Sequence, residues 1–108
     1  MNSADAIAAL GGLANEHRLA VYRLLVQTGP EGLPAGEIAE ALDLPPSSLS
    51  FHLAHLKRAG LATQRRESRS LIYAADFESM NALVSYLTDN CCGGRPCAPA
   101  AKKRKRVA

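Results

Sequence analysis

Tryptophan is absent from this chain of 108 residues, and aromatic residues make up only 5% of it. A core therefore has to be packed mainly from leucine, alanine and valine. No apolar run approaches the roughly 20 residues that a membrane-spanning helix needs, and no basic segment precedes the apolar residues near the start of the chain. We therefore expect a cytoplasmic protein with one folded domain and no membrane partner.

Catalytic motifs are absent as well. The sequence has no glycine-rich phosphate loop, no H-E-x-x-H pattern and no Ser/His/Asp arrangement of the kind that hydrolases use. The cysteines lie together near one end of the chain, which is a poor starting point for an enclosed pocket. We expect no enzymatic activity.

Acidic residues are absent from residues 91–108, which carry six lysines and arginines. Residues 1–90 hold seven basic and ten acidic residues, a net charge of −3, so the overall charge of +3 arises at the C-terminal end. Five of those seven basic residues lie between Lys57 and Arg69. Such a local concentration is typical of proteins that contact nucleic-acid phosphates. The run KKRKR at 102–106 indicates only unspecific, salt-sensitive affinity for DNA.

The segment Pro45 to Gly60, PPSSLSFHLAHLKRAG, predicts an amphipathic helix that begins with a serine N-cap. Three leucines at i, i+4 and i+7, the first of them Leu49, form one apolar stripe. His52 lies beside this stripe, so we expect a hydrogen-bonded histidine at the edge of the core. The opposite face is polar and basic but includes Phe51, which suits a thymine methyl group. We predict that the helix enters a DNA major groove. The predicted contacts are Ser47, Ser48, Ser50, Phe51, His55 and Arg58.

Two short segments with the character of β-strands, LATQRR and SLIYAAD, follow this helix. Residues 67–69 separate them, a pattern that predicts a two-stranded hairpin. We call the helix predicted within residues 45–60 the reading helix. A second helix at about residues 34–42 precedes it across a tight turn, and the hairpin follows it, an order that indicates a winged helix-turn-helix. The hairpin is then a basic wing that contacts phosphates or a minor groove. Its contact residues are Arg65, Arg66 and Arg69.

Three further helices are predicted, over residues 3–13, 15–29 and 77–90, with Ser3, Asn15 and Asp76 as N-caps. The fold class is therefore mainly α, with about five helices and the two-stranded hairpin. The last helix has more apolar positions than a small core can cover, which favours pairing with a second subunit.

The strings LANEHRLAVYRLL, SLSFHLAHLKRAGL and RRESRSLIY occur in this order and resemble the ArsR/SmtB family of metal-responsive repressors over about residues 5–90. The resemblance implies a homodimer joined through the first and last helices, bound to a palindromic operator in double-stranded DNA. It also implies release from DNA when a metal ion or metalloid binds. We assign residues 1–90 to DNA binding and dimerisation. The expected interface residues are Ile7, Leu10, Phe77, Met80, Leu83, Val84 and Leu87.

All three cysteines lie within seven residues, directly after the last predicted helix. Their odd number and the expected reducing compartment argue against structural disulfides. Cys91 and Cys92 can present two thiolates to one soft ion, and the two glycines that follow permit a turn that brings in Cys97. We predict a metal-binding segment at 91–97 and a basic, disordered tail at 98–108. A thiol redox sensor, or a constitutive DNA-binding module with idle cysteines, stays open as an alternative.

Family members with a vicinal cysteine pair after the last helix are similar to the arsenic-sensing branch. The resemblance therefore implies arsenite, As(III), or antimonite, Sb(III), as the inducer, held by three thiolates, with no organic cofactor. Two other sensing sites of the family have no counterpart, because their positions hold Pro34 and Gly36 in one case and residues 76–90 lack histidine in the other. Cd(II), Zn(II) and methylarsenite stay open as alternative inducers.

Overall fold

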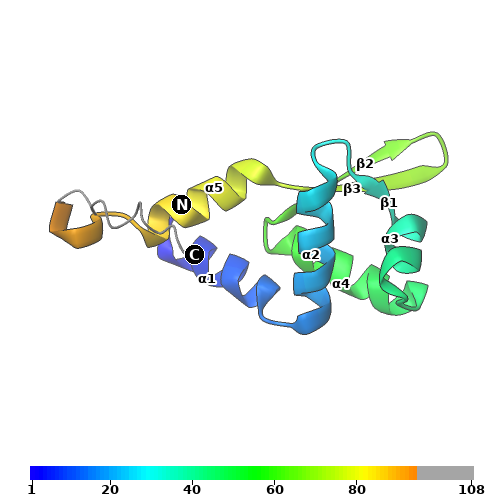
Figure 1. Cartoon of the computed structure of the whole chain (residues 1–108), viewed down its shortest axis with the longest axis horizontal. Helices are drawn as coiled ribbons and strands as arrows, with labels where there is room; N and C mark the ends of the chain where they lie inside the picture. The colour runs from blue at the N-terminus through cyan, green and yellow to red at the C-terminus, as the bar shows by residue number, and fades with distance from the viewer. Residues whose placement is uncertain (95–108) are drawn as a thin grey trace, which may run out of the picture.

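Five α-helices and a small antiparallel sheet make up the part of the chain that the computed structural model describes, residues 1–94 (Figure 1). This confirms the predicted winged helix-turn-helix with five helices. The elements are α1 (Ser3–Leu13), α2 (Glu16–Thr28), β1 (Leu33–Pro34), α3 (Ala35–Leu42), α4 (Pro46–Arg58), β2 (Ala62–Glu67), β3 (Ser70–Ala75), α5 (Phe77–Leu87) and the 3-10 turn η1 (Cys91–Gly94).

The N-termini of α2 and α5 follow the sequence closely, whereas the N-cap of α1 differs from the prediction. Asn15 caps α2 and Asp76 caps α5, as predicted, because each side chain accepts a backbone N–H of the first turn. The prediction that Ser3 caps α1 is wrong, since Asn2 accepts the backbone N–H of Asp5 at 2.8 Å and Ser3 is already helical. The bounds of α1 nevertheless match the predicted residues 3–13.

The sheet has three strands in the order β1-β3-β2, one more than the sequence predicted. β2 and β3 form the expected hairpin, with Glu67 opposite Ser70 and a two-residue turn in which Ser68 adopts a φ of 59°. The added strand β1 has only two residues, Leu33 and Pro34, and pairs antiparallel with β3. So short a strand has no alternation of side chains by which it could be recognised.

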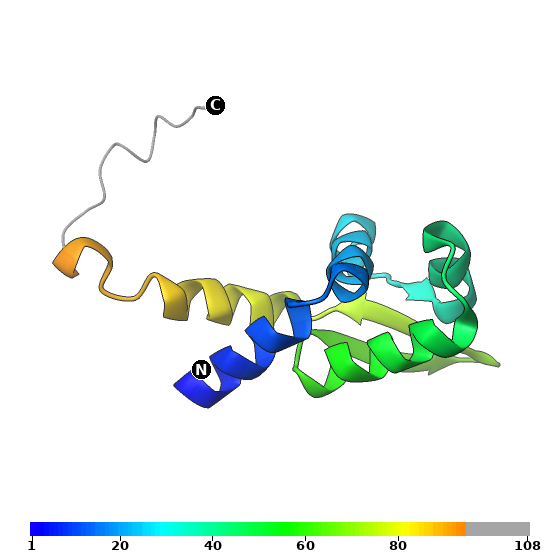
Figure 2. The same ribbon diagram turned by 90° about the horizontal axis from the view of Figure 1, so that it is seen from below.

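The core lies between α2, α3, α4 and the sheet and includes Ala6 and Ala9 of α1 and Leu83 of α5. The rest of α1 and α5 lies side by side and extends away from it (Figures 1 and 2). Each of the three reading-helix leucines faces this core with at most 1% of its surface exposed. Within residues 1–94 no helix is long and apolar enough to cross a bilayer. The largest fully buried side chains are Val21, Leu25, Ile38, Leu49, Leu53, Leu56 and Leu61.

Arg18, near the start of α2, fixes the end of α1. Its side chain is only 9% exposed, and its guanidinium donates from Nε to the carbonyl of Gly12 at 2.7 Å and from Nη2 to that of Gly11 at 3.3 Å. These are carbonyls that the end of a helix leaves without intrahelical partners. A charged donor therefore holds α1 against α2.

Candidate nucleic-acid interface and cysteine segment

The turn that leads into α4 differs in detail from the prediction. Asp43 adopts a left-handed conformation with a φ of 54° at the end of α3, and Pro45 occupies the N-cap position of α4. Pro45 makes no side-chain capping bond, so the prediction of a serine N-cap is wrong. Pro46 is the first residue of α4. Proline suits this position because the backbone N–H that it lacks would have no intrahelical acceptor there. Ser47 and Ser48 consequently lie within the first turn.

α4 presents the outer face that its sequence predicts. The predicted contact residues Ser47, Ser48, Ser50 and Arg58 are exposed, and His55 is half-buried. Phe51 is 63% exposed, so a large apolar ring faces solvent beside three hydroxyl groups. A surface of this composition can offer both hydrogen bonds and an apolar contact to base edges.

Histidines gather where α4 meets the start of α2. The ring of His52 lies 5.6 Å from that of His17, centroid to centroid, and the buried Nδ1 of His52 has no hydrogen-bond partner among the described residues. The expected hydrogen bond is therefore not found at that atom. Burial, followed by the charges of His17, Arg18 and His55, lowers the pKa of His52. Desolvation and nearby arginines, Arg18 and Arg58, lower the pKa of His55. Both imidazoles are thereby favoured in the neutral form.

The wing carries the three predicted arginines in different environments. The Nε of Arg65 lies 2.8 Å from a carboxylate oxygen of Glu67, and its Nη2 donates to the carbonyl of Glu31, also at 2.8 Å. Arg66 and Arg69 are exposed near the tip. Arg65 thus joins the wing to the loop before β1, while Arg66 and Arg69 extend its basic surface.

One basic side chain that the sequence reasoning missed lies between the reading helix and the wing. The Nζ of Lys57, in the last turn of α4, donates to Oε1 of Gln64 on β2 at 2.7 Å. Lys57 follows Ser50 by seven residues and so lies on the same side of the helix. That spacing is the signal by which it could have been included.

The apolar surface predicted for dimerisation is divided between solvent and core. Leu83 is 3% exposed and belongs to the core of the protomer, and Phe77 and Met80 are half-buried against that core. The other four predicted residues form an exposed apolar surface on α1 and α5, a feature that often marks an interface. Their exposures are 67% for Ile7, 43% for Leu10, 52% for Val84 and 56% for Leu87.

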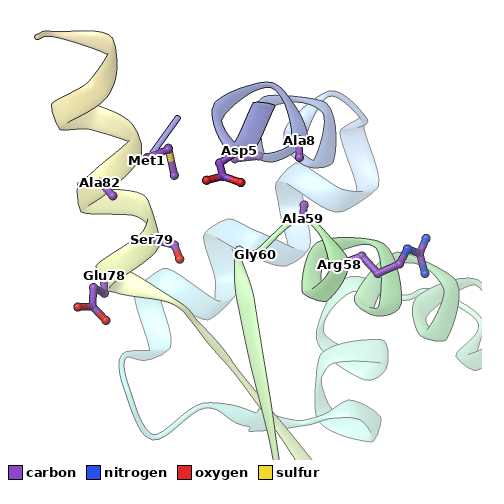
Figure 3. A pocket seen from close by; sticks show the side chains of 10 residues that line it. Met1, Asp5, Ala8, Arg58, Ala59, Gly60, Glu78, Ser79 and Ala82 are labelled. Carbon is purple, nitrogen blue, oxygen red and sulfur yellow. The ribbon is translucent and has the colours of Figure 1, made fainter. Parts of the chain in front are cut away.

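A hollow of about 430 Å³ lies between α1, the end of α4 and the start of α5 (Figure 3). Asp5 and Glu78 contribute carboxylates from α1 and α5, and Arg58 lines the hollow from the end of the reading helix. The end of the reading helix therefore lies beside both helices that carry the exposed apolar surface.

The cysteine segment begins in η1. Cys91 and Cys92 are exposed, and their Sγ atoms lie 3.5 Å apart. Cys92 and Gly93 both adopt left-handed conformations, with φ values of 58° and 67°. Cys97, the third predicted ligand, and the basic tail lie outside the described residues. Within residues 1–94 no group of three or more His, Cys, Asp or Glu side chains is arranged to hold a metal ion.

Comparison with known proteins identifies regulators of transcription. A helix-turn-helix domain model matches residues 13–65. The transcriptional activator HlyU of Vibrio cholerae is 36% identical over 86 residues, which cover 80% of this chain and 77% of HlyU. The regulator YgaV of Escherichia coli is 30% identical over 82% of this chain and 87% of its own. A Halobacterium salinarum protein, whose name assigns it to arsenical resistance as the operon repressor ArsR, is 36% identical over 73% of this chain and 60% of its own.

Solved structures give the same result. HlyU of Vibrio cholerae superposes with a TM-score of 0.67 at 35% identity, over 84% of this chain and 96% of that one. Its reduced form superposes with a TM-score of 0.64. A homodimeric winged helix-turn-helix DNA-binding domain from Mycobacterium bovis superposes with a TM-score of 0.63 at 27% identity, over 87% of each chain.

Proposed function

Since the chain belongs to the ArsR-type winged helix-turn-helix regulators of transcription, we propose that it is an arsenite-responsive repressor. It binds operator DNA as a homodimer and leaves the operator when As(III) or Sb(III) binds its cysteines. The observation that carries the proposal is the pair of exposed thiols of Cys91 and Cys92, 3.5 Å apart directly beyond α5. Its action is binding rather than catalysis.

DNA binding rests on α4 and the wing. The outer face of α4 offers hydroxyls and the Phe51 ring to base edges, and Arg66 and Arg69 meet phosphates beside them. In the proposal the exposed apolar surface of α1 and α5 joins two copies, and the homodimeric state of the relative from Mycobacterium bovis supports the pairing. Two reading helices about 34 Å apart then enter successive major grooves on one side of the duplex.

Thiol spacing supports a shared soft ion. Two thiolates bound to a tetrahedral zinc ion at about 2.3 Å have sulfur atoms about 3.8 Å apart, close to the 3.5 Å between Cys91 and Cys92. Trivalent arsenic bonds three thiolates in a pyramid with narrower angles, and Cys97 is the third ligand in the proposal. The relative named for arsenical resistance supports this ion over other soft cations.

The site is coupled to DNA through α5. Ligands at the end of α5 reorder the segment next to Leu87, which lies on the exposed apolar surface. A changed pairing of the two subunits then changes the separation of the two reading helices. Because coupling is reciprocal, arsenite binds more weakly to the protein on DNA than to the protein alone, by the same factor. A coupling of about 1–3 kcal/mol corresponds to about 5–150-fold.

The test uses the full chain and a labelled duplex from upstream of its own gene. We expect fluorescence anisotropy to report tight binding that sodium arsenite weakens about 5–150-fold, and Cys91→Ser or Cys92→Ser to abolish this response. Thr88→Ser, a mild change one turn earlier, is the matched control and should respond like the wild type. Unchanged release in both cysteine variants contradicts the proposed sensor.

A thiol redox sensor is the second candidate, favoured by the same sulfur spacing and by the similarity to HlyU, of which a reduced form is known. In this case hydrogen peroxide oxidises the thiols of Cys91 and Cys92 to a disulfide and is itself reduced to two water molecules. Peroxide then releases the DNA, dithiothreitol restores binding, and arsenite has no effect. The two candidates thus predict opposite effects of arsenite on the wild-type protein.

A further inference from the structure

A chain of two hydrogen bonds runs from the reading helix into the core of the wing. The ammonium of Lys57 donates to Oε1 of Gln64 at 2.7 Å, and Nε2 of Gln64 donates to the hydroxyl of Tyr73 at 2.9 Å. Gln64 and Tyr73 are directly opposite in the β2–β3 register, so their side chains lie on one face of the hairpin. Tyr73 is packed against the hydrophobic core.

This arrangement permits only one orientation of the Gln64 amide. An ammonium group has donors and no acceptor, so the oxygen of the amide must face Lys57. The nitrogen must then face Tyr73, whose hydroxyl can accept as well as donate. The hydrogen bond between Gln64 and Tyr73 therefore holds the amide oxygen of Gln64 toward Lys57. The position of the Lys57 ammonium thus depends on the Tyr73 hydroxyl.

The opposite face of β2 is also anchored. Side chains of successive strand residues point to opposite faces, so Arg65 lies on the face away from Gln64. Arg65 pairs with Glu67 and donates to the carbonyl of Glu31, each at 2.8 Å. β2, whose Gln64 accepts the hydrogen bond from Lys57, is therefore anchored on both faces, although it lies at the edge of the three-stranded sheet.

We propose that Lys57 binds a phosphate of the DNA backbone, and that Gln64 and Tyr73 are positioning residues for its ammonium at the junction of the reading helix and the wing. Two protons of the ammonium stay available when one is donated to Gln64. A lysine otherwise loses rotamer entropy when it is fixed, and here the protein orders it before DNA arrives. The inference rests on the DNA binding of the proposed function but not on arsenite.

The experiment is a double-mutant cycle on the full chain, with binding to the labelled duplex followed by anisotropy at several salt concentrations. Lys57→Gln should weaken binding about tenfold and make the slope of log affinity against log salt shallower by about two, because both subunits of the dimer lose one phosphate contact. Tyr73→Phe should weaken binding about threefold in the wild-type background and have no effect in the Lys57→Gln background.

Two controls separate positioning from general stability and charge. Arg23→Gln removes one positive charge from the exposed side of α2 and should leave the salt slope unchanged. Thermal unfolding should give similar midpoints for Lys57→Gln alone and combined with Tyr73→Phe, so that the cycle compares folded proteins.

An unchanged salt slope for Lys57→Gln, with tight binding by the wild type, overturns this inference and leaves the proposed function intact. Equal losses from Tyr73→Phe in both backgrounds overturn the positioning role, because the hydroxyl then acts independently of Lys57. If the wild type binds no duplex at all, the proposed function and this inference are both wrong.

Discussion

At Gly12 α1 packs tightly against Ala59, the C-cap of α4, and a single added methyl group tests this contact. A Cβ at Gly12 would lie 2.8 Å from the Cβ of Ala59 and 3.4 Å from a methyl carbon of Leu61. Carbon atoms attract one another best at about 3.5–4.0 Å, so α1 has to move away. Overpacking of this kind costs about 1–3 kcal/mol, and the gain in helix propensity offsets about 0.5–1 kcal/mol of it. We expect Gly12→Ala to lose about 1 kcal/mol of stability.

Gly11 is the matched control, because it precedes Gly12 in the same helix. A Cβ at Gly11 would meet nothing within 4 Å, so Gly11→Ala should gain about 0.5–1 kcal/mol from helix propensity alone. Urea unfolding followed by circular dichroism measures both variants, at one protein concentration because dimerisation contributes to stability. Equal stabilisation by the two substitutions would refute the close seating of α1 on Ala59.

Three further predictions concern histidine titration, the wing and the subunit interface. Because the pKa of His52 is lowered in the folded protein, the unfolded chain binds more protons below about pH 6.5. Stability should fall as the pH drops below that value, less steeply in His52→Gln, as urea unfolding at pH 5 and 7.5 will measure. Arg66→Gln with Arg69→Gln removes four guanidinium groups from a dimer and should make the salt slope of DNA binding shallower by up to about four, whereas Arg65→Gln, whose guanidinium pairs with Glu67, should change it less. Leu87→Asp should shift sedimentation toward a monomer while preserving the helical circular dichroism spectrum, since Leu87 is 56% exposed.

The sequence predicted the helices because each buries one face with the period of an α-helix. The leucines of α4 are an example, since Leu49, Leu53 and Leu56 are all buried where their spacing places them. The strand at Leu33 and Pro34 could not be predicted, because it exists only through its pairing with β3. The helix start at Pro46 depends on the backbone conformation of Pro45, which composition alone leaves open between neighbouring residues.

The exposure of the wing arginines could be predicted from the sequence, but the hydrogen-bond partners of the charged side chains could not. Arg65 was predicted to contact DNA from its position in the wing, yet it donates to the carbonyl of Glu31, 34 residues earlier. Lys57 was overlooked because its bond to Gln64 depends on how α4 and β2 meet in space. Sequence periodicity assigns a residue to a face, whereas its hydrogen bonds depend on which elements the fold brings together.

The start of α5 is joined to the end of the reading helix, and the proposed release from DNA depends on this junction to carry movements of α5 to the reading helix. The backbone N–H of Asp76, which caps α5, donates to the carbonyl of Leu61, three residues after α4, at 2.8 Å. With 11 residues α5 is about 16 Å long, so a displacement of about 1.5 Å at its cysteine end is a tilt of about 5°. The same tilt applied to the 13 residues of α4 moves its far end by almost 2 Å. Base pairs are stacked roughly 3.4 Å apart, so this movement is about half of one base-pair step. Such a movement misplaces Ser47 relative to the bases when the second reading helix of a dimer stays in its groove.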